Sequence, residues 1–308
     1  MGRRDRDEER PSDPPAPEPG RVDGRSHTVT IRELPDQLTR DRDPNLRERE
    51  HHLTLPSGPD REPVRDGARL YRLRGTEVDL LERAACFRSV FTDDLTRASG
   101  DESRASTDLR SLERQGLIEE RTVTRLRDGV VADVVAVTDE GKALLEHHRD
   151  PHGDAGQQYY AGWVKPAEVW HDASLFRMCW EMESEFGGDG TRIVRVVLDD
   201  ELKGRAYEAL HEARDTEDDE HDARRIVAGV QGLHLDEHDR FIFPDVRLEV
   251  ADRDGTIRTV DLERITEHYH RGHISSKAAA GFQMFRGSSG ATRRGTPRDH
   301  FKIGRVLE

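Results

Sequence analysis

The chain contains few hydrophobic residues and few lysines, cysteines or aromatic residues. Hydrophobic residues make up 33% of its 308 positions and aromatic residues 6%, whereas charged residues make up 36%. This apolar content is low for a chain that folds throughout, so we expect part of it to lack a packed core. The sequence has neither an apolar run long enough to cross a bilayer nor a signal-peptide pattern, which predicts a cytoplasmic protein without a membrane partner.

Lysine and cysteine are both scarce. Cys86 and Cys179 lie in apolar helical patterns and are expected to be reduced thiols in the core. Lysine occurs at only five positions, so arginine carries almost all of the positive charge, a usage associated with GC-rich bacterial genomes. The net charge of −14 argues against a protein that coats DNA through bulk charge. Any contact with nucleic acid therefore needs a local basic patch.

Two terminal segments are expected to be flexible. Residues 1–69 mix charges of both signs with proline and glycine and lack the apolar groups that offset chain entropy, which predicts a disordered tail, with a short strand near Ile31 as one exception. Residues 287–308 form a basic tail that is rich in glycine, serine and threonine at its start.

Residues 70–149 carry the pattern of a DNA-reading module. Apolar spacing predicts three helices, at 77–91, from Thr92, and from 103–105 to about 115. Two alternating runs around Asp128-Gly129 predict a β-hairpin, and Thr138 is a plausible N-cap for a fourth helix. Three helices, a hairpin and a closing helix predict a winged helix-turn-helix. The turn at 137–141 is similar to the one that follows the wing in winged-helix regulators.

Arginines of this module are the candidate DNA contacts, because such modules place the third helix in the major groove and the wing near the backbone. However, residues 76–148 hold sixteen acidic against ten basic residues, which leaves an alternative role in protein interaction or dimerisation open. The exposed face of the third helix is expected to show Arg104, Ser106, Asp108, Arg110 and Arg114, and the wing offers Arg121, Arg125 and Arg127.

Residues 150–167 read as a linker, and residues 168–286 as an α/β unit. Its expected elements are helices at 168–186 and 199–213, a β-branched strand at 192–198, a hairpin at 241–262, and a last helix at about 273–285.

Acidic residues and one lysine gather in this hairpin and the helix after it. Asp245 follows Pro244 at the start of one strand, and Asp261 and Glu263 lie two apart on the next, so they point to the same face. Such carboxylates can hold a divalent cation, and the pattern predicts a Mg²⁺ site at these three acids. Lys277 would orient water or stabilise charge. The alternative is that Asp245 and Asp261 only flank the turn.

The order Pro-Asp, acid, lysine resembles the restriction-endonuclease-like fold, whose signature is PD-(D/E)xK. The position two after Glu263 is Ile265 and not lysine, so Lys277 would act from the next helix, and Glu201 would be an added helix acid. Histidines at 268, 270 and 273 match no common zinc motif and are expected to contact phosphate or the core.

More narrowly, residues 70–285 resemble the replication-relaxation family of plasmids and mobile elements, which pairs a winged helix with a degenerate nuclease-like domain. The resemblance implies a bacterial DNA-binding protein in replication, relaxation or transfer of mobile DNA, such as plasmid replication. It leaves open a Mg²⁺-dependent endonuclease, a domain without activity, and a homodimer. The alternative function is a transcriptional regulator whose C-terminal domain dimerises or senses a ligand. The matching features are His171, Glu201-Leu202-Lys203, Pro244-Asp245, Asp261-x-Glu263 and the spacing from Tyr269 to Lys277.

Overall fold

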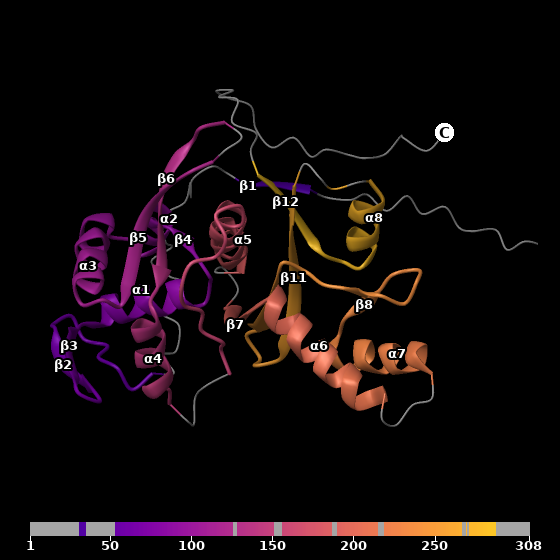
Figure 1. Ribbon diagram of the computed structural model, residues 1–308, viewed down its shortest axis with the longest axis horizontal. Coiled ribbons are helices and arrows are strands. Elements are labelled where there is room, and N and C mark those ends of the chain that lie inside the picture. The colour runs from indigo at the N-terminus through magenta and orange to yellow at the C-terminus, as the bar shows by residue number, and fades with distance from the viewer. Residues whose placement is uncertain are drawn as a thin grey trace, which may run out of the picture.

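The structure is a computed structural model that describes residues 31–34, 53–125, 128–150, 156–186, 190–214, 219–266, 269 and 271–287. These residues form a mixed α+β fold of helices and several small sheets (Figure 1). Across the described part of the chain, no helix has both the length and the apolar character needed to cross a membrane.

The N-terminal unit (residues 53–150) has the predicted order of three helices, a hairpin and a fourth helix. The hairpin and a short strand form a sheet of order β4-β6-β5. The third helix starts earlier than expected because Asp101 caps it and accepts a hydrogen bond from the backbone of Arg104. The elements are α1 (Gly75–Ala85), β4 (Val90–Phe91), α2 (Thr92–Ala98), α3 (Glu102–Arg114), β5 (Ile118–Thr124), β6 (Val131–Val137) and α4 (Asp139–His147).

The turn after the hairpin is held by Thr138, as its sequence predicted. Its hydroxyl oxygen accepts a hydrogen bond from the backbone of Gly141 at 3.1 Å and donates one to the carbonyl of Gly116 at 2.6 Å. A Cβ added at Gly141 would lie 2.2 Å from the carbonyl oxygen of Leu117. Helix α4 therefore approaches the start of β5 more closely than any other residue type allows.

Gly141→Ala should lower the free energy of unfolding by about 2–3 kcal/mol, because backbone must move to admit the methyl group. Gly204→Ala is the matched control, since a Cβ at this helical glycine would meet nothing within 4 Å. Urea unfolding of both variants measures the difference, and equal midpoints would contradict the close approach.

Part of the segment predicted to be disordered is ordered. Residues 62–73 form a hairpin of β2 (Glu62–Asp66) and β3 (Arg69–Leu73), and Leu53 and Val64 are buried in the main core. The tail prediction is therefore wrong for 53–69, because apolar side chains at alternate positions bury one face of a strand even in a charged segment. Residues 1–30 and 35–52 of that tail, and 288–308 of the basic one, lie outside the described residues.

The C-terminal unit (residues 163–287, with β1) is built on a five-stranded sheet of order β1-β12-β11-β10-β7. Strands β7, β10 and β11 are antiparallel, whereas β12 runs parallel to β11 and to β1. The elements are β1 (Ile31–Leu34), α5 (Val169–Phe186), β7 (Arg192–Leu198), α6 (Asp199–Arg214), α7 (Glu220–Gln231), β8 (His234–Leu235), β9 (Phe241–Ile242), β10 (Val246–Ala251), β11 (Ile257–Ile265), α8 (Arg271–Ala279) and β12 (Gln283–Gly287).

The last element differs from the prediction of one helix to residue 285. Helix α8 ends at Ala279, and Gly281 adopts a left-handed φ of 83° that only glycine takes readily. Residues 283–287 then form β12, in which Met284 and Phe285 are buried. The helical spacing continues past the true end, so periodicity alone missed the glycine stop.

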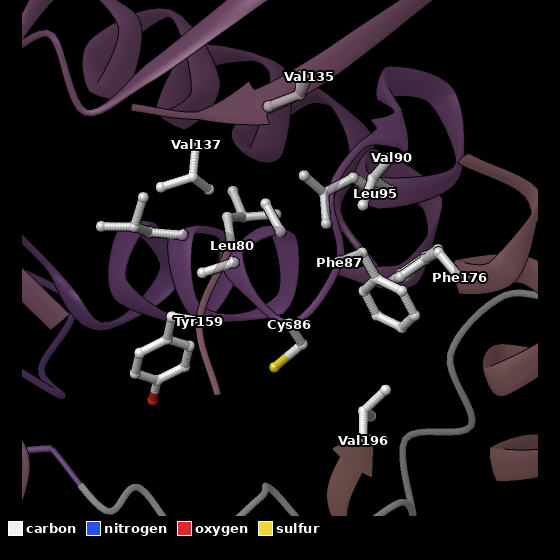
Figure 2. Close-up of a cluster of buried hydrophobic side chains, with 14 of the residues drawn as sticks. Leu80, Cys86, Phe87, Val90, Leu95, Val135, Val137, Tyr159, Phe176 and Val196 are labelled. Atoms are coloured by element: carbon white, nitrogen blue, oxygen red, sulfur yellow. The ribbon is translucent and has the colours of Figure 1, made fainter. Parts of the chain in front are cut away.

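The two units share one hydrophobic core. Leu80, Phe87 and Leu95 of the N-terminal unit belong to the same buried cluster as Phe176 and Val196 of the C-terminal unit (Figure 2). The rings of Phe87 and Phe176 meet edge to face at 5.5 Å. Cys86 and Cys179 are buried thiols, as predicted.

A buried ion pair between α2 and α5 also joins the two units. The guanidinium of Arg177 on α5 contacts the fully buried carboxylate of Asp94 on α2, and it also lies 4.3 Å from the ring centroid of Phe91. The position of α5, and of the residues at its start, is therefore set partly by the N-terminal unit.

Candidate functional site

Asp245 and Glu263 lie opposite one another on neighbouring strands. Val246 of β10 pairs with Leu262 of β11. Because the two strands are antiparallel, Asp245, which precedes Val246, lies opposite Glu263, which follows Leu262. The backbone N–H of Asp245 donates to Glu263 Oε2 at 3.2 Å, and the backbone N–H of Arg264 donates to Asp245 Oδ2 at 2.7 Å. Two of the predicted carboxylates are thus held side by side by the hairpin itself.

Lys277 reaches this pair from helix α8. Its ammonium group forms an ion pair with Glu263 Oε1 and donates to the carbonyl of Phe243 at 3.1 Å. The hydroxyl of Tyr269 also donates to Glu263 Oε1. The Glu263 side chain is fully buried, whereas 16% of the Asp245 side chain is exposed. The structure therefore brings together three of the four predicted catalytic residues and leaves Asp245 as the accessible acid.

His171 completes the group from the first turn of α5. Its Nε2 lies 3.4 Å from Asp245 Oδ2, and its Nδ1 lies 3.2 Å from Asp172 Oδ1. The sequence marked His171 only as a match to a family, since its approach to Asp245 depends on how α5 packs against the sheet at β7 and β11. The neighbouring acid, Asp172, is the one feature of the local sequence that could have indicated a functional histidine at position 171.

Asp261 does not join this group, so its predicted role as a metal ligand and catalytic residue is wrong. It points to the same sheet face as Glu263, as the strand period predicts. Its carboxylate instead forms a two-pronged ion pair with Arg247 of β10, at 2.7 and 2.8 Å. The buried Arg247 also donates to the carbonyls of Gln231 and Gly232, which fixes it against α7. The guanidinium of Arg247, on the neighbouring strand, thus balances the negative charge of Asp261.

The predicted helix acid pairs with a neighbouring strand, and of the three predicted histidines the structure describes His273. Glu201 pairs with Arg195 of β7, and Arg205 lies 3.7 Å from the same carboxylate. His268 and His270 lie outside the described residues, and the ring of His273 stands 6.2 Å from that of Tyr269.

Burial and neighbouring charges shift the pKa values of this group in opposite directions. Burial and the Asp245 charge raise the pKa of Glu263 to about 7, although Lys277 and Tyr269 oppose that shift. Burial alone would raise the pKa of Asp245, but contacts with His171 and Arg264 lower it overall. Burial lowers the pKa of His171, yet Asp172 and Asp245 outweigh it and raise the pKa to about 9. One acid is therefore held ionised beside another that readily takes a proton.

The free energy of unfolding should fall as the pH rises through the pKa of His171 in the folded chain. Its folded pKa of about 9 exceeds the roughly 6.5 of an unfolded histidine. Its stabilisation is therefore complete below the unfolded value and is lost as pH rises through the folded one. We expect a loss of about 1–2 kcal/mol, since the ring is partly exposed. Urea unfolding near pH 6 and near pH 9.5 measures it, and His171→Gln should flatten the profile; equal slopes would contradict this.

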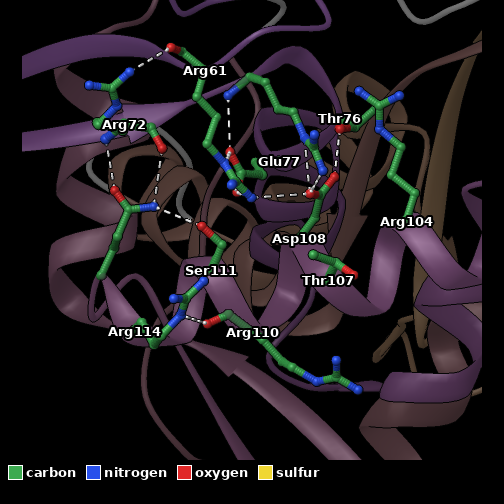
Figure 3. A network of polar contacts seen from close by, with 12 residues as sticks. Arg61, Arg72, Thr76, Glu77, Arg104, Thr107, Asp108, Arg110, Ser111 and Arg114 are labelled. Atoms are coloured by element: carbon green, nitrogen blue, oxygen red, sulfur yellow. Dashed lines mark hydrogen bonds and ion pairs between the residues drawn. The ribbon is translucent and has the colours of Figure 1, made fainter.

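The predicted DNA-contacting arginines divide into two groups. Arg110 and Arg114 on α3 are exposed, and Arg114 folds back to the carbonyl of Arg110 (Figure 3). Two of the wing arginines make contacts within the chain, although Arg121 is itself exposed. Arg121 stacks on Trp163 at 4.4 Å, and Arg125 pairs with Asp128 at 2.6 Å.

Three of the other residues predicted for the DNA-contacting face are Arg104, Arg127 and Asp108. Arg104 donates to the carbonyl of Pro59, and Arg127 lies outside the described residues. Asp108 was expected on the exposed face but is fully buried. It accepts hydrogen bonds from Arg74 at 3.0 Å and from Thr76 at 2.6 Å, which anchors α3 to the start of α1 (Figure 3). The exposed basic face of α3 is therefore narrower than the sequence predicted.

The donor set of the acidic site suits Mg²⁺. In the described part of the chain no three acids, histidines or cysteines converge as a ready-made metal cage. Mg²⁺ in phosphate-handling sites, however, is commonly bound through one or two carboxylates, with waters and substrate phosphates completing its shell. Asp245 reaches the solvent, and Glu263 lies beside it as a second hard oxygen donor that is buried and at present accepts from Lys277, Tyr269 and the Asp245 N–H. These two residues are the ones that would hold the ion.

Comparison with known proteins places the chain in no family. No family model, no curated protein and no solved structure matches it.

Proposed function

We propose that the chain is a DNA-binding protein that acts in replication, relaxation or transfer of a plasmid or other mobile element. In this proposal the N-terminal unit is a winged helix and the C-terminal unit a restriction-endonuclease-like domain. The observation that carries it is the meeting of Asp245, Glu263 and Lys277, which come from two strands and a helix. Strand β12 pairs in parallel with β11 and so extends the sheet that carries Glu263.

The N-terminal unit supports the same proposal through its shape. Helix α3 presents Arg110 and Arg114 to solvent beside the hairpin of β5 and β6. Arginine forks onto guanine edges and phosphates, so a helix of this kind can lie in a major groove. The acidic surroundings imply that binding relies on these few contacts.

A second candidate, phosphodiester hydrolysis, is favoured by the chemistry of the acidic site. When bound by Asp245 and Glu263, Mg²⁺ would neutralise charge on a phosphodiester. Lys277 places a fixed cation beside Glu263, where it would stabilise negative charge developing on phosphate. His171 and the Arg264 N–H hold the Asp245 carboxylate in one orientation.

One experiment tests DNA binding and cleavage together. Duplex DNA should be shifted by the protein at about 50 mM salt and released as salt rises. Nicking of supercoiled plasmid with Mg²⁺, lost in Asp245→Ala but kept in Asp254→Ala, would establish the hydrolase; Asp254 lies exposed in the turn of the same hairpin. A sequence-specific shift of promoter DNA without nicking would favour the transcriptional regulator. No salt-dependent binding would sink the proposal.

A further inference from the structure

His171 lies between two carboxylates that belong to different elements. Its Nε2 faces Asp245 Oδ2 at 3.4 Å and its Nδ1 faces Asp172 Oδ1 at 3.2 Å. Asp245 Oδ2 also accepts the Arg264 N–H at 2.7 Å. One oxygen of Asp245 is thus fixed from two sides, so its carboxylate has little freedom to rotate.

Asp172 is itself held by the N-terminal unit. Arg88, in the segment between α1 and β4, places its Nε 2.9 Å from Asp172 Oδ2. The same guanidinium lies 3.0 Å from Asp199 and contacts Asp200, both at the start of α6. The Asp172 side chain is only 5% exposed, so solvent does little to screen this contact. Arg88 therefore fixes the starts of two helices of the C-terminal unit.

We infer that His171 is a positioning residue that orients Asp245 for a divalent cation, and that Asp172 with Arg88 fixes the ring of His171. This inference rests on the proposed function, because it assigns a role toward the Mg²⁺ that Asp245 and Glu263 would hold. Carboxylate ligands are themselves commonly oriented by hydrogen bonds, and losing such a partner typically costs 10–100-fold in metal affinity.

The arrangement makes the acidic site dependent on both units. Asp245 and Glu263 lie in the C-terminal sheet, but the contacts that orient Asp245 lead through α5 to Arg88. The ion pair of Arg177 with Asp94 also joins the units but contacts neither His171 nor Asp245 in the described interactions. A change at Arg88 should therefore reach the site, whereas weakening the Arg177 contact should affect stability alone.

The test measures binding of Mg²⁺ alone to the full chain by titration calorimetry, without DNA or turnover. His171→Ala should raise the Kd for Mg²⁺ about 10–100-fold. His171→Gln should restore most of the affinity, since its side-chain amide donates from the place of Nε2. Arg88→Gln and Asp172→Asn should weaken binding in the same direction. His221→Ala, which breaks an exposed histidine–aspartate contact with Asp239, is the matched control and should change nothing.

The outcomes separate this inference from the function on which it rests. If the wild-type chain binds Mg²⁺ and His171→Ala binds it equally well, the positioning role is overturned and the proposed function stands. If the wild-type chain binds no Mg²⁺, the metal-dependent function and this inference both fail. A role in folding alone would lower the melting temperature and leave the Kd unchanged. Should His171→Ala not fold, Asp172→Asn decides, because it preserves side-chain volume.

Discussion

Replacing Lys277 by methionine should destabilise the protein by about 3–5 kcal/mol near pH 8, because it leaves a buried carboxylate without its cation. Glu263 is fully buried, and the Lys277 ammonium group is its one ionic partner among the described contacts. Tyr269 and the Asp245 N–H would still donate to that carboxylate, but neither carries a charge. Urea unfolding measures the loss.

The loss should depend on pH in a defined direction. The pKa of Glu263 is already raised to about 7 in the folded chain, mainly by burial, and removing Lys277 would raise it further. Below about pH 7 the acid is protonated in both proteins, so the penalty is small; above it, only the wild type compensates the charge. The difference in stability should therefore widen as pH rises past 7.

Two further variants make this prediction specific. The double variant Glu263→Gln with Lys277→Met should recover much of the loss, since removing both partners leaves no buried charge unpaired. Lys142→Met, at an exposed i,i+4 pair with Glu146, should cost less than about 0.5 kcal/mol. A Lys277 variant as stable as the Lys142 variant would show that Glu263 does not need its partner.

The sequence predicted most of the acidic site because its parts are local. Pro244-Asp245 opens a strand, Glu263 lies on the other arm of the same hairpin, and both lie where strand periodicity puts them. Lys277 was within reach because α8 follows β11 directly. Contacts between neighbouring elements of a hairpin and the next helix leave few alternatives, so spacing sufficed.

The errors arose where the partner of a side chain comes from a distant part of the chain, or where a single glycine, Gly281, ends a helix whose apolar spacing continues. Asp261 had the right face, but its pairing with Arg247 depends on strand register. Asp108 on α3 is buried with a hydrogen bond from Arg74, which lies just before α1 and not on α3. The contact of His171 with Asp245 needs the packing of α5 on the sheet. Such long-range contacts are fixed by tertiary packing, which periodicity within one element does not report.

Replacing Arg110 and Arg114 together by alanine should weaken DNA binding about 100-fold, at roughly 10-fold for each arginine that contacts a base or a phosphate. Both side chains are exposed on α3 and so are available to a major groove. The slope of log affinity against log salt should fall by about 2 if both contact phosphate. Gel-shift titrations from about 50 to 200 mM salt measure both quantities.

Arg125→Ala is the informative control for this prediction, because it removes one positive charge from the wing, as each of the two α3 substitutions does from the helix. Arg125 pairs with Asp128 and stands 4.8 Å from the ring of Trp170, so its guanidinium serves the contact between the wing and α5. We expect its loss to change DNA affinity less than about 3-fold and to lower stability instead. Equal losses at Arg125 and at α3 would mean that the wing leaves Trp170 to bind DNA. No loss at either would favour a module that binds protein, since sixteen acids against ten basic residues in 76–148 already oppose a polyanion.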